Sequence, residues 1–241
     1  MRILVLTPCS KTKDDSIPPS LKTLTPHDYV DDARLADKLI KTRNRVLKDP
    51  RAQLGSKETY AFDLYVRAGK AYTHIYRYLY KRLRNTLLED HQITCLFLSG
   101  GYGIIHALEK ARKYQATFNQ STAYSNGIPY TTPLWHPILT EVCSSIFRKL
   151  NPEYVYVFGS RDYTQFVKGT ERWKRRDNIK IFESYGSSGP SWISPILHNL
   201  MESAMNRDVD KFNRKYPDDF ISQKLLMQKT RADENARPLL S

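Results

Sequence analysis

Four short apolar runs constrain the fold of this chain more than any other feature of its sequence. They are ILVL (3 to 6), ITCLFL (93 to 98), YVYVF (154 to 158) and IKIF (179 to 182). None of them alternates strictly between apolar and polar residues, which is typical of parallel strands that are covered on both faces. The sequence therefore predicts four buried strands.

Helical patterns separate these runs. The stretches 60–88, 133–149, 161–168 and 190–206 predict helices, and prolines open the second and the fourth. A chain that alternates strands with helices favours an α/β fold. We expect an open, mostly parallel sheet flanked by helices, with an additional helical segment after the first strand.

The chain of 241 residues is long enough to bury one large core. We expect a single α/β domain over residues 1–206. The polar and basic segment 14–59 forms a helical insertion or a subdomain of it, and the sequence does not choose between these. Residues 207–241 form a charged C-terminal extension, and we expect its end to be mobile.

Basic residues outnumber acidic ones by 38 to 25, and the resulting formal net charge of +13 favours a polyanionic partner. The three cysteines are isolated, and the six histidines show no paired ligand spacing, so we expect no metal and no cofactor. The chain begins directly with a strand and contains neither a signal peptide nor a long apolar window, so we expect a cytoplasmic protein that does not contact a membrane.

Each predicted strand ends in an unusual loop. The loops are TPCSKTK (7 to 13), SGGYG (99 to 103), GSRDY (159 to 163) and SYGSSGPSW (184 to 192). Ligands of open α/β sheets bind beyond the carboxyl ends of the strands. We therefore expect one site that all four loops build.

Taken one at a time, the loops also have plain structural interpretations. Lysines after the first strand could be solvated or could bind phosphate. The paired glycines could form a tight turn or admit a ligand close to the backbone, although the GxGxxG spacing of a dinucleotide site is absent. Ser160 could cap a helix, the serines of the last loop could form an anion nest, and Trp192 could belong to the core or stack on a base.

Three of these segments resemble motifs of the YaaA-like family, which includes the peroxide-stress protein YaaA. The run SGGYGIIHALEKARKYQ (99 to 115) aligns with a family motif without gaps, GSRDY aligns with a later motif, and CSKTKD (9 to 14) is similar to the family's amino-terminal loop. The resemblance covers about a third of the chain. The residues on matched positions are Ser99, Gly100, Tyr102, Gly103, Glu109, Tyr114, Ser160, Asp162 and Tyr163.

The chain departs from the family pattern at four positions. Glu109 replaces an aspartate, Ala107 and Lys113 replace prolines, and Arg161 replaces an asparagine. The family resemblance implies a nucleic-acid-binding α/β fold linked to DNA protection or base chemistry. The chain also looks like an anti-phage DNA glycosylase that excises α-glucosylated hydroxymethylcytosine from viral DNA.

Cleavage of an N-glycosidic bond develops positive charge on the sugar, which a nearby carboxylate can stabilise while it orients water. Glu109 and Asp162 are the candidate catalytic residues because both lie on matched motifs. Their structural alternative is to neutralise Lys11, Lys13 or Arg161 in a network of charges. Lys11 or Lys13 could instead form a Schiff base and give lyase activity.

The remaining candidates fall into two groups. The expected substrate-binding residues are Ser10, Lys11, Lys13, Ser99, Gly101, Tyr102, Tyr114, Ser160, Arg161, Tyr163, Ser187, Ser188 and Trp192. The expected contacts to the DNA backbone are Arg82, Arg84, Lys174, Arg175 and Arg176, which lie in the basic runs KRLR and RWKRR.

Together these features predict a DNA glycosylase that flips out and excises a modified base from double-stranded phage DNA, leaving an abasic site, in anti-phage defence. Two alternatives remain open. One is a non-catalytic DNA-binding protective protein of the YaaA type. The other is an enzyme that acts on a free nucleotide or on a modified base in tRNA.

Overall fold

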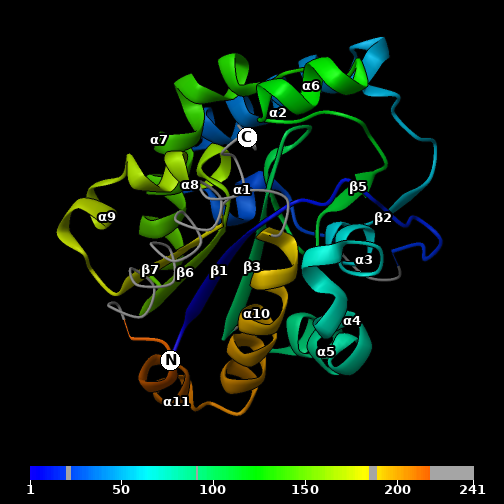
Figure 1. The fold of residues 1–241 in the computed structure, drawn as a ribbon. Helices are drawn as coiled ribbons and strands as arrows, with labels where there is room; N and C mark the ends of the chain where they lie inside the picture. Colours follow the sequence, from blue (N-terminus) through cyan, green and yellow to red (C-terminus); the bar gives the residue numbers. More distant parts are fainter. Residues whose placement is uncertain (20–22, 91, 185–188, 218–241) are drawn as a thin grey trace, which may run out of the picture.

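The four apolar runs form neighbouring strands of one sheet in the computed structural model, which describes residues 1–19, 23–90, 92–184 and 189–217. The order is β4-β3-β1-β6-β7, and all neighbours are parallel except β4 against β3. The predicted α/β fold is confirmed (Figure 1). The strands are β1 (Ile3–Pro8), β3 (Ile93–Ser99), β4 (Gly103–His106), β6 (Tyr154–Gly159) and β7 (Ile179–Glu183).

The fifth strand, β4, was not predicted, because the SGGYG segment was expected to be a loop. Ser99 and Gly103 pair across a tight turn between β3 and β4, which confirms the tight-turn interpretation of the paired glycines. A Cβ on Gly101 would lie 2.5 Å from the ring of Tyr114, and one on Gly103, whose φ is +69°, would lie 2.6 Å from Trp135. These glycines therefore permit close packing and a left-handed turn.

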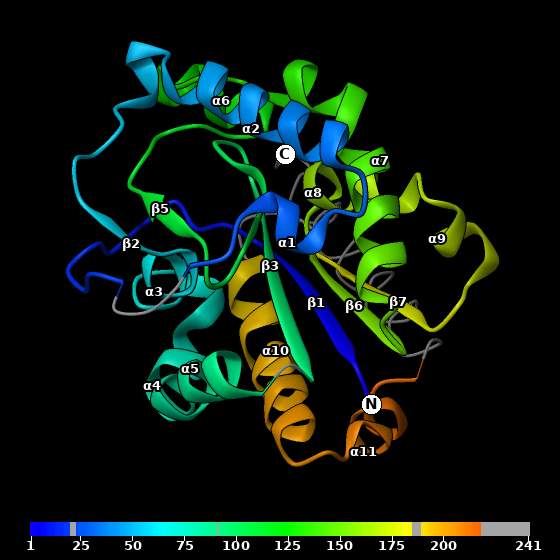
Figure 2. The same cartoon turned by 180° about the vertical axis from the view of Figure 1, so that it is seen from behind.

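Helices cover both faces of the sheet, as Figures 1 and 2 show. One layer contains α10 (Gly189–Met205), α4 (Thr73–Tyr78) and α5 (Tyr80–Glu89), which pack against one another. The opposite layer contains α1 (Pro26–Tyr29), α2 (Ala33–Leu47), α7 (Thr132–Leu150), α8 (Arg161–Lys168) and α9 (Glu171–Arg175). The helices predicted at 133–149, 161–168 and 190–206 are confirmed within a residue or two at each end.

The stretch 60–88 does not form the single helix that its pattern predicts. It is divided into α3 (Ala61–Val66), the 3₁₀ helix η2 (Lys70–Tyr72), α4 and α5. The division falls at Gly69, where a Cβ would lie 2.7 Å from both the carbonyl oxygen of Tyr65 and the ring of Tyr72. The remaining elements are η1 (Pro50–Ala52), β2 (Glu58–Tyr60), β5 (Lys110–Arg112), α6 (Gln120–Asn126) and α11 (Val209–Lys215), with β2 and β5 forming a small antiparallel pair.

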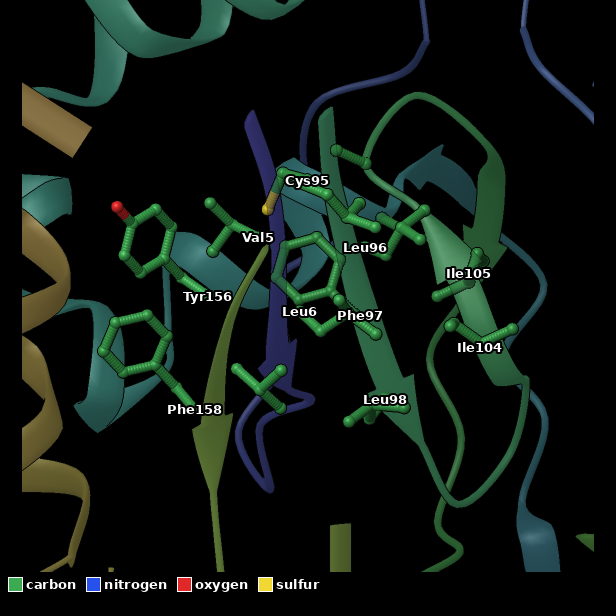
Figure 3. Packing of buried hydrophobic residues seen from close by; sticks show 14 of the residues in the cluster. Val5, Leu6, Cys95, Leu96, Phe97, Leu98, Ile104, Ile105, Tyr156 and Phe158 are labelled. Carbon is green, nitrogen blue, oxygen red and sulfur yellow. The ribbon is translucent and has the colours of Figure 1, made fainter. Parts of the chain in front are cut away.

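The interior of the sheet is apolar and tightly packed (Figure 3). Leu6, Phe97 and Phe158 have no exposed surface, and the rings of Phe158 and Phe182 stack with centroids 4.7 Å apart. Burial of such side chains contributes about 1.5 to 3 kcal/mol each to folding. This core holds the carboxyl ends of β1, β6 and β7 in fixed positions.

The sequence did not determine where two segments lie, and both pack directly against this domain. Within 14–59, α2 packs on α7. After residue 206, Phe212 of α11 packs edge-on against Tyr156 at 5.4 Å, so the C-terminal extension begins as part of the folded domain. Residues 218–241, including the end expected to be mobile, lie outside the described residues. In the part of the chain that the structure describes, no helix has both the length and the apolar character needed to cross a membrane.

Candidate functional site

A cavity of about 840 Å³ opens at the carboxyl ends of β1 and β6. In the sheet, the chain continues from β1 to β3, its neighbour on one side, whereas it continues from β6 to β7, its neighbour on the opposite side. The sequence order of strands therefore reverses between β1 and β6, and loops that leave in opposite directions open a crevice at such a point. The cavity lies where ligands of open α/β sheets bind.

The cavity wall comes from six parts of the chain. They are the loop after β1, η2, the segment 115–128, the first turn of α8, and single residues after β7 and in α10. The lining residues are Pro8, Cys9, Ser10, Lys11, Thr12, Lys13, Lys70, Ala71, Gln115, Ala116, Thr117, Asn119, Ser121, Thr122, Asn126, Ile128, Gly159, Ser160, Arg161, Asp162, Tyr163, Ser184 and Ile193.

Among the described residues, four cationic side chains and one carboxylate line this wall. The cations are those of Lys11, Lys13, Lys70 and Arg161, and the carboxylate is that of Asp162. The excess of positive charge favours an anionic ligand. Arg161 and Asp162 lie in the first turn of α8, where the free N–H groups and the helix dipole add to the attraction for anions.

Asn119 positions the carboxylate of Asp162. Its Nδ2 donates a hydrogen bond to Oδ2 of Asp162 over 2.8 Å. Its Oδ1 accepts from the backbone N–H of Thr122 over 2.8 Å and so caps α6. Asp162 lines the cavity and makes no ion pair with any described residue.

The Lys13 ammonium lies 4.2 Å from the centre of the Tyr114 ring, and its Nζ donates to the carbonyl oxygen of Lys11 at 3.4 Å. Burial lowers the pKa of Lys13, and a charge on Cys9 would oppose that shift. Nearby, Sγ of Cys9 lies 3.8 Å from the hydroxyl of Tyr163. Cys9, Lys13 and Tyr163 thus line the cavity together, and each is less exposed than Lys11.

Seven of the residues expected in the site line the cavity: Ser10, Lys11, Lys13, Ser160, Arg161, Asp162 and Tyr163. Ser160 occupies the N-cap position of α8, as its helix-cap interpretation requires, yet its side chain makes no capping hydrogen bond. Its hydroxyl can therefore bind a ligand.

The residues expected from the SGGYG motif lie behind this wall. Ser99 is fully buried, its Oγ lies 2.6 Å from the hydroxyl of Tyr114, and it accepts from the backbone N–H of Tyr102 over 3.0 Å. Gly101 packs on the Tyr114 ring. Ser99, Gly101, Tyr102 and Tyr114 support the cavity wall without lining it. The expected site built by all four loops is therefore not formed, because the SGGYG loop does not line the cavity.

Glu109 lies in a separate buried network. Its Oε1 pairs with Nη1 of Arg43 over 2.8 Å, and its Oε2 accepts from the hydroxyl of Tyr29 over 2.7 Å and from the backbone N–H of His106 over 2.9 Å. Burial would lower the pKa of Arg43, but the charge of Glu109 and its hydrogen bonds raise it overall. The structure corrects the expectation that Glu109 and Asp162 share one site. Glu109 ties α2 to the β4–β5 segment in a structural network of charges, but its partner is Arg43 and not Lys11, Lys13 or Arg161.

Among the described residues of the last expected loop, SYGSSGPSW (184–192), Ser184 lines the cavity. Trp192, which lies in α10, packs against the core and does not line the cavity, which agrees with its core interpretation. Ser187 and Ser188 lie outside the described residues.

The expected contacts to the DNA backbone are not at the cavity either. Arg82 donates to Oδ1 of Asn206, just beyond the end of α10 at the amino edge of the sheet, and Arg84 pairs with the fully buried Asp63 over 3.2 Å.

Lys174, Arg175 and Arg176 lie in and after α9, which is held beside the start of β6 by the bond from Arg172 to the carbonyl oxygen of Pro152. Lys174 pairs with Glu171, Arg175 pairs with Asp177, and Arg176 lies over the Trp173 ring.

Sequence reasoning missed Lys70 and Asn119. The pattern of an asparagine before a short helix could have identified Asn119 as an N-cap. Nothing in the sequence signals that the same side chain reaches Asp162, 43 residues further along.

Within the described ranges, no group of three or more His, Cys, Asp or Glu side chains is arranged to hold a metal ion. The chain matches no model of a protein family, no curated protein and no solved structure.

Proposed function

We propose that this protein is an N-glycosidic bond hydrolase that acts on DNA. The observation that carries the proposal is the position of Asp162, the single carboxylate among four cationic side chains in the described wall of the cavity. A site that only attracted phosphates would be weakened by a carboxylate without a salt-bridge partner. Its presence supports a catalytic role.

Asp162 can meet the requirements of this reaction. As the bond between base and sugar breaks, the sugar acquires positive charge, and a carboxylate fixed beside it stabilises that charge and orients the attacking water. The hydrogen bond from Asn119 holds the carboxylate in place. Lys11, Lys70 and Arg161, which are exposed at the cavity, can bind the phosphates on either side of the reacting nucleotide.

The size of the cavity and the charge of the chain support an extruded nucleotide of a polymer as the substrate. An enzyme that acts on a base in a duplex must flip the nucleotide out of the stack. A cavity of about 840 Å³ lies in the upper part of the range for small-ligand sites and is large enough for a nucleotide with an added sugar. The net charge of +13 favours a polyanion over a free nucleotide.

The finer assignment follows from the motif resemblance. Asp162 lies in GSRDY, the segment that aligns with the YaaA-like family, and we propose glucosylated hydroxymethylcytosine in phage DNA as the excised base, in anti-phage defence. The test is incubation of the protein with unmodified, hydroxymethylated and glucosylated phage DNA, and with tRNA. Mass spectrometry measures released bases, and an aldehyde-reactive probe measures abasic sites.

The expected result is base release from glucosylated DNA, abolished in Asp162→Asn with DNA binding retained. Asp210→Asn is the matched control, because Asp210 is exposed on α11 at the opposite end of the sheet. Salt-sensitive binding without base release from any substrate would refute the hydrolase and leave a DNA-binding protein. Release from tRNA alone would move the substrate to RNA.

A further inference from the structure

We propose that Lys13 forms an imine with the aldehyde of an abasic site, which gives this protein a strand-cleaving lyase activity. The proposal rests on the proposed function, because the abasic sugar is the product that base excision leaves in the cavity. The sequence left Lys11 and Lys13 as equal candidates for such a reaction. The structure separates them.

Lys13 differs from the other cations of the cavity in its surroundings. Lys11 and Lys70 are exposed, and Nζ of Lys11 donates to Oδ1 of Asn126 over 3.2 Å. Arg161 carries a guanidinium, which stays protonated and is a poor nucleophile. Lys13 is half-buried in the wall, so its amine meets a bound sugar out of bulk water.

Lys13 also lacks the carboxylate partner that fixes other lysines of this protein. Lys113 pairs with Asp15 over 2.9 Å, and Lys168 pairs with Glu183 over 2.8 Å, whereas Lys13 makes no ion pair with any described residue. A lysine that is desolvated and unpaired has a larger share of neutral amine near pH 7, and the neutral amine is the attacking species. The lowered pKa of Lys13 has this direction.

The ring of Tyr114 lies where it can stabilise the charged product of the attack. It lies 4.2 Å from Nζ of Lys13 and is held by its own hydroxyl, 2.6 Å from Oγ of Ser99 and 3.1 Å from the hydroxyl of Tyr65. An aromatic face attracts a cation. It therefore stabilises the positively charged iminium that forms once the neutral amine has attacked.

The step balances without an oxidant or a reductant. The neutral Nζ adds to the C1′ aldehyde of the ring-opened abasic sugar, and loss of water gives a protonated imine. A carboxylate, which we assign to Asp162, removes a proton from C2′, and the electron pair expels the 3′ phosphate as the C3′–O bond breaks. Water then hydrolyses the imine, which frees Lys13 and an unsaturated aldehyde on the cleaved strand.

The experiment uses the full chain and an oligonucleotide that carries one abasic site made enzymatically from deoxyuridine, so base excision is not required. Sodium borohydride is added, and it reduces an imine to a stable secondary amine. We expect a covalent protein–DNA product whose peptide map places the modification on Lys13. Without borohydride, we expect the strand to be cleaved on the 3′ side of the abasic site.

Two variants and a control sharpen the result. Lys13→Ala and Lys13→Arg should each lose trapping and strand cleavage by at least about a hundredfold, and Lys13→Arg keeps the positive charge. Lys211→Ala, on α11 and exposed, should match the native protein. The peptide map of the native protein does not depend on whether either variant folds.

The outcomes separate this proposal from the proposed function. Base release from modified DNA without any trapped product on the abasic oligonucleotide would overturn the role of Lys13 alone. A trapped product on Lys13 from a protein that releases no base would support the role of Lys13 and refute the proposed base excision. Trapping on another lysine would also overturn the assignment.

Discussion

Asn119 donates a hydrogen bond to Asp162 over 2.8 Å and so joins the start of α6 to the first turn of α8. The same asparagine caps α6 with its other side-chain atom. One side chain thus fixes a helix and directs the only carboxylate that the described cavity wall contains. Its two contacts can be separated by substitution.

Asn119→Asp and Asn119→Ser both keep an oxygen that can cap α6 and both remove the amide donor. We expect kcat for base release to fall about tenfold to a hundredfold, because displacement of a catalytic group by about 1 Å has effects of that size. KM should change little, since the phosphate-binding cations are untouched. Steady-state kinetics measures both, and thermal melting checks that each variant stays folded. Native kcat in both variants would exclude a positioning role.

Glu109→Gln should destabilise the protein by about 3 kcal/mol, because it leaves the buried guanidinium of Arg43 without its counter-charge. The double variant Arg43→Met with Glu109→Leu should lose less, since neither charge remains. Urea unfolding measures the free energy of unfolding of each. Base release per folded molecule should be unchanged in Glu109→Gln. A stable Glu109→Gln protein that released no base would return Glu109 to the reaction.

His106 should make the protein less stable as the pH falls from 6.5 towards 4. Burial lowers its pKa in the folded state from 6.5 to about 4. The unfolded chain therefore takes up a proton first, and stability present above pH 6.5 is lost over this window, by up to about 3 kcal/mol.

The control for this prediction is His106→Asn, whose side-chain oxygen can still accept from the backbone N–H of Leu108 as Nδ1 of His106 does. The slope of unfolding free energy against pH should be shallower in the variant between pH 6.5 and 4. Asp14, Asp31 and Asp49 have pKa values below the ordinary 3.8 of an aspartate, so they affect stability only below that window. Equal slopes in both proteins would show that His106 is not the group responsible.

Lys70→Ala should weaken DNA binding about fivefold to tenfold and reduce the dependence of log affinity on log salt by about one unit, the effect of losing one phosphate contact. Fluorescence anisotropy with a short duplex at several salt concentrations measures both. Lys211→Ala removes the same charge far from the cavity and should have no effect. Equal losses in the two variants would indicate that only net charge matters.

The sequence by itself determined the sheet and the edge at which the site lies. Apolar runs without alternation favour strands that are covered on both faces, and helices between them favour parallel connections whose loops meet at one edge of the sheet. For this reason Ser10, Lys11, Lys13, Arg161 and Asp162 could be placed near one another before the structure was known.

Only the tertiary structure decided which charged residues meet a ligand. Glu109 and Asp162 look equivalent in the sequence, yet one is enclosed with Arg43 and the other faces the cavity beside Asn119. The difference depends on contacts between side chains 43 or more residues apart, and on whether burial supplies a counter-charge. Neither is encoded in local pattern, because both depend on how the helices pack on the sheet.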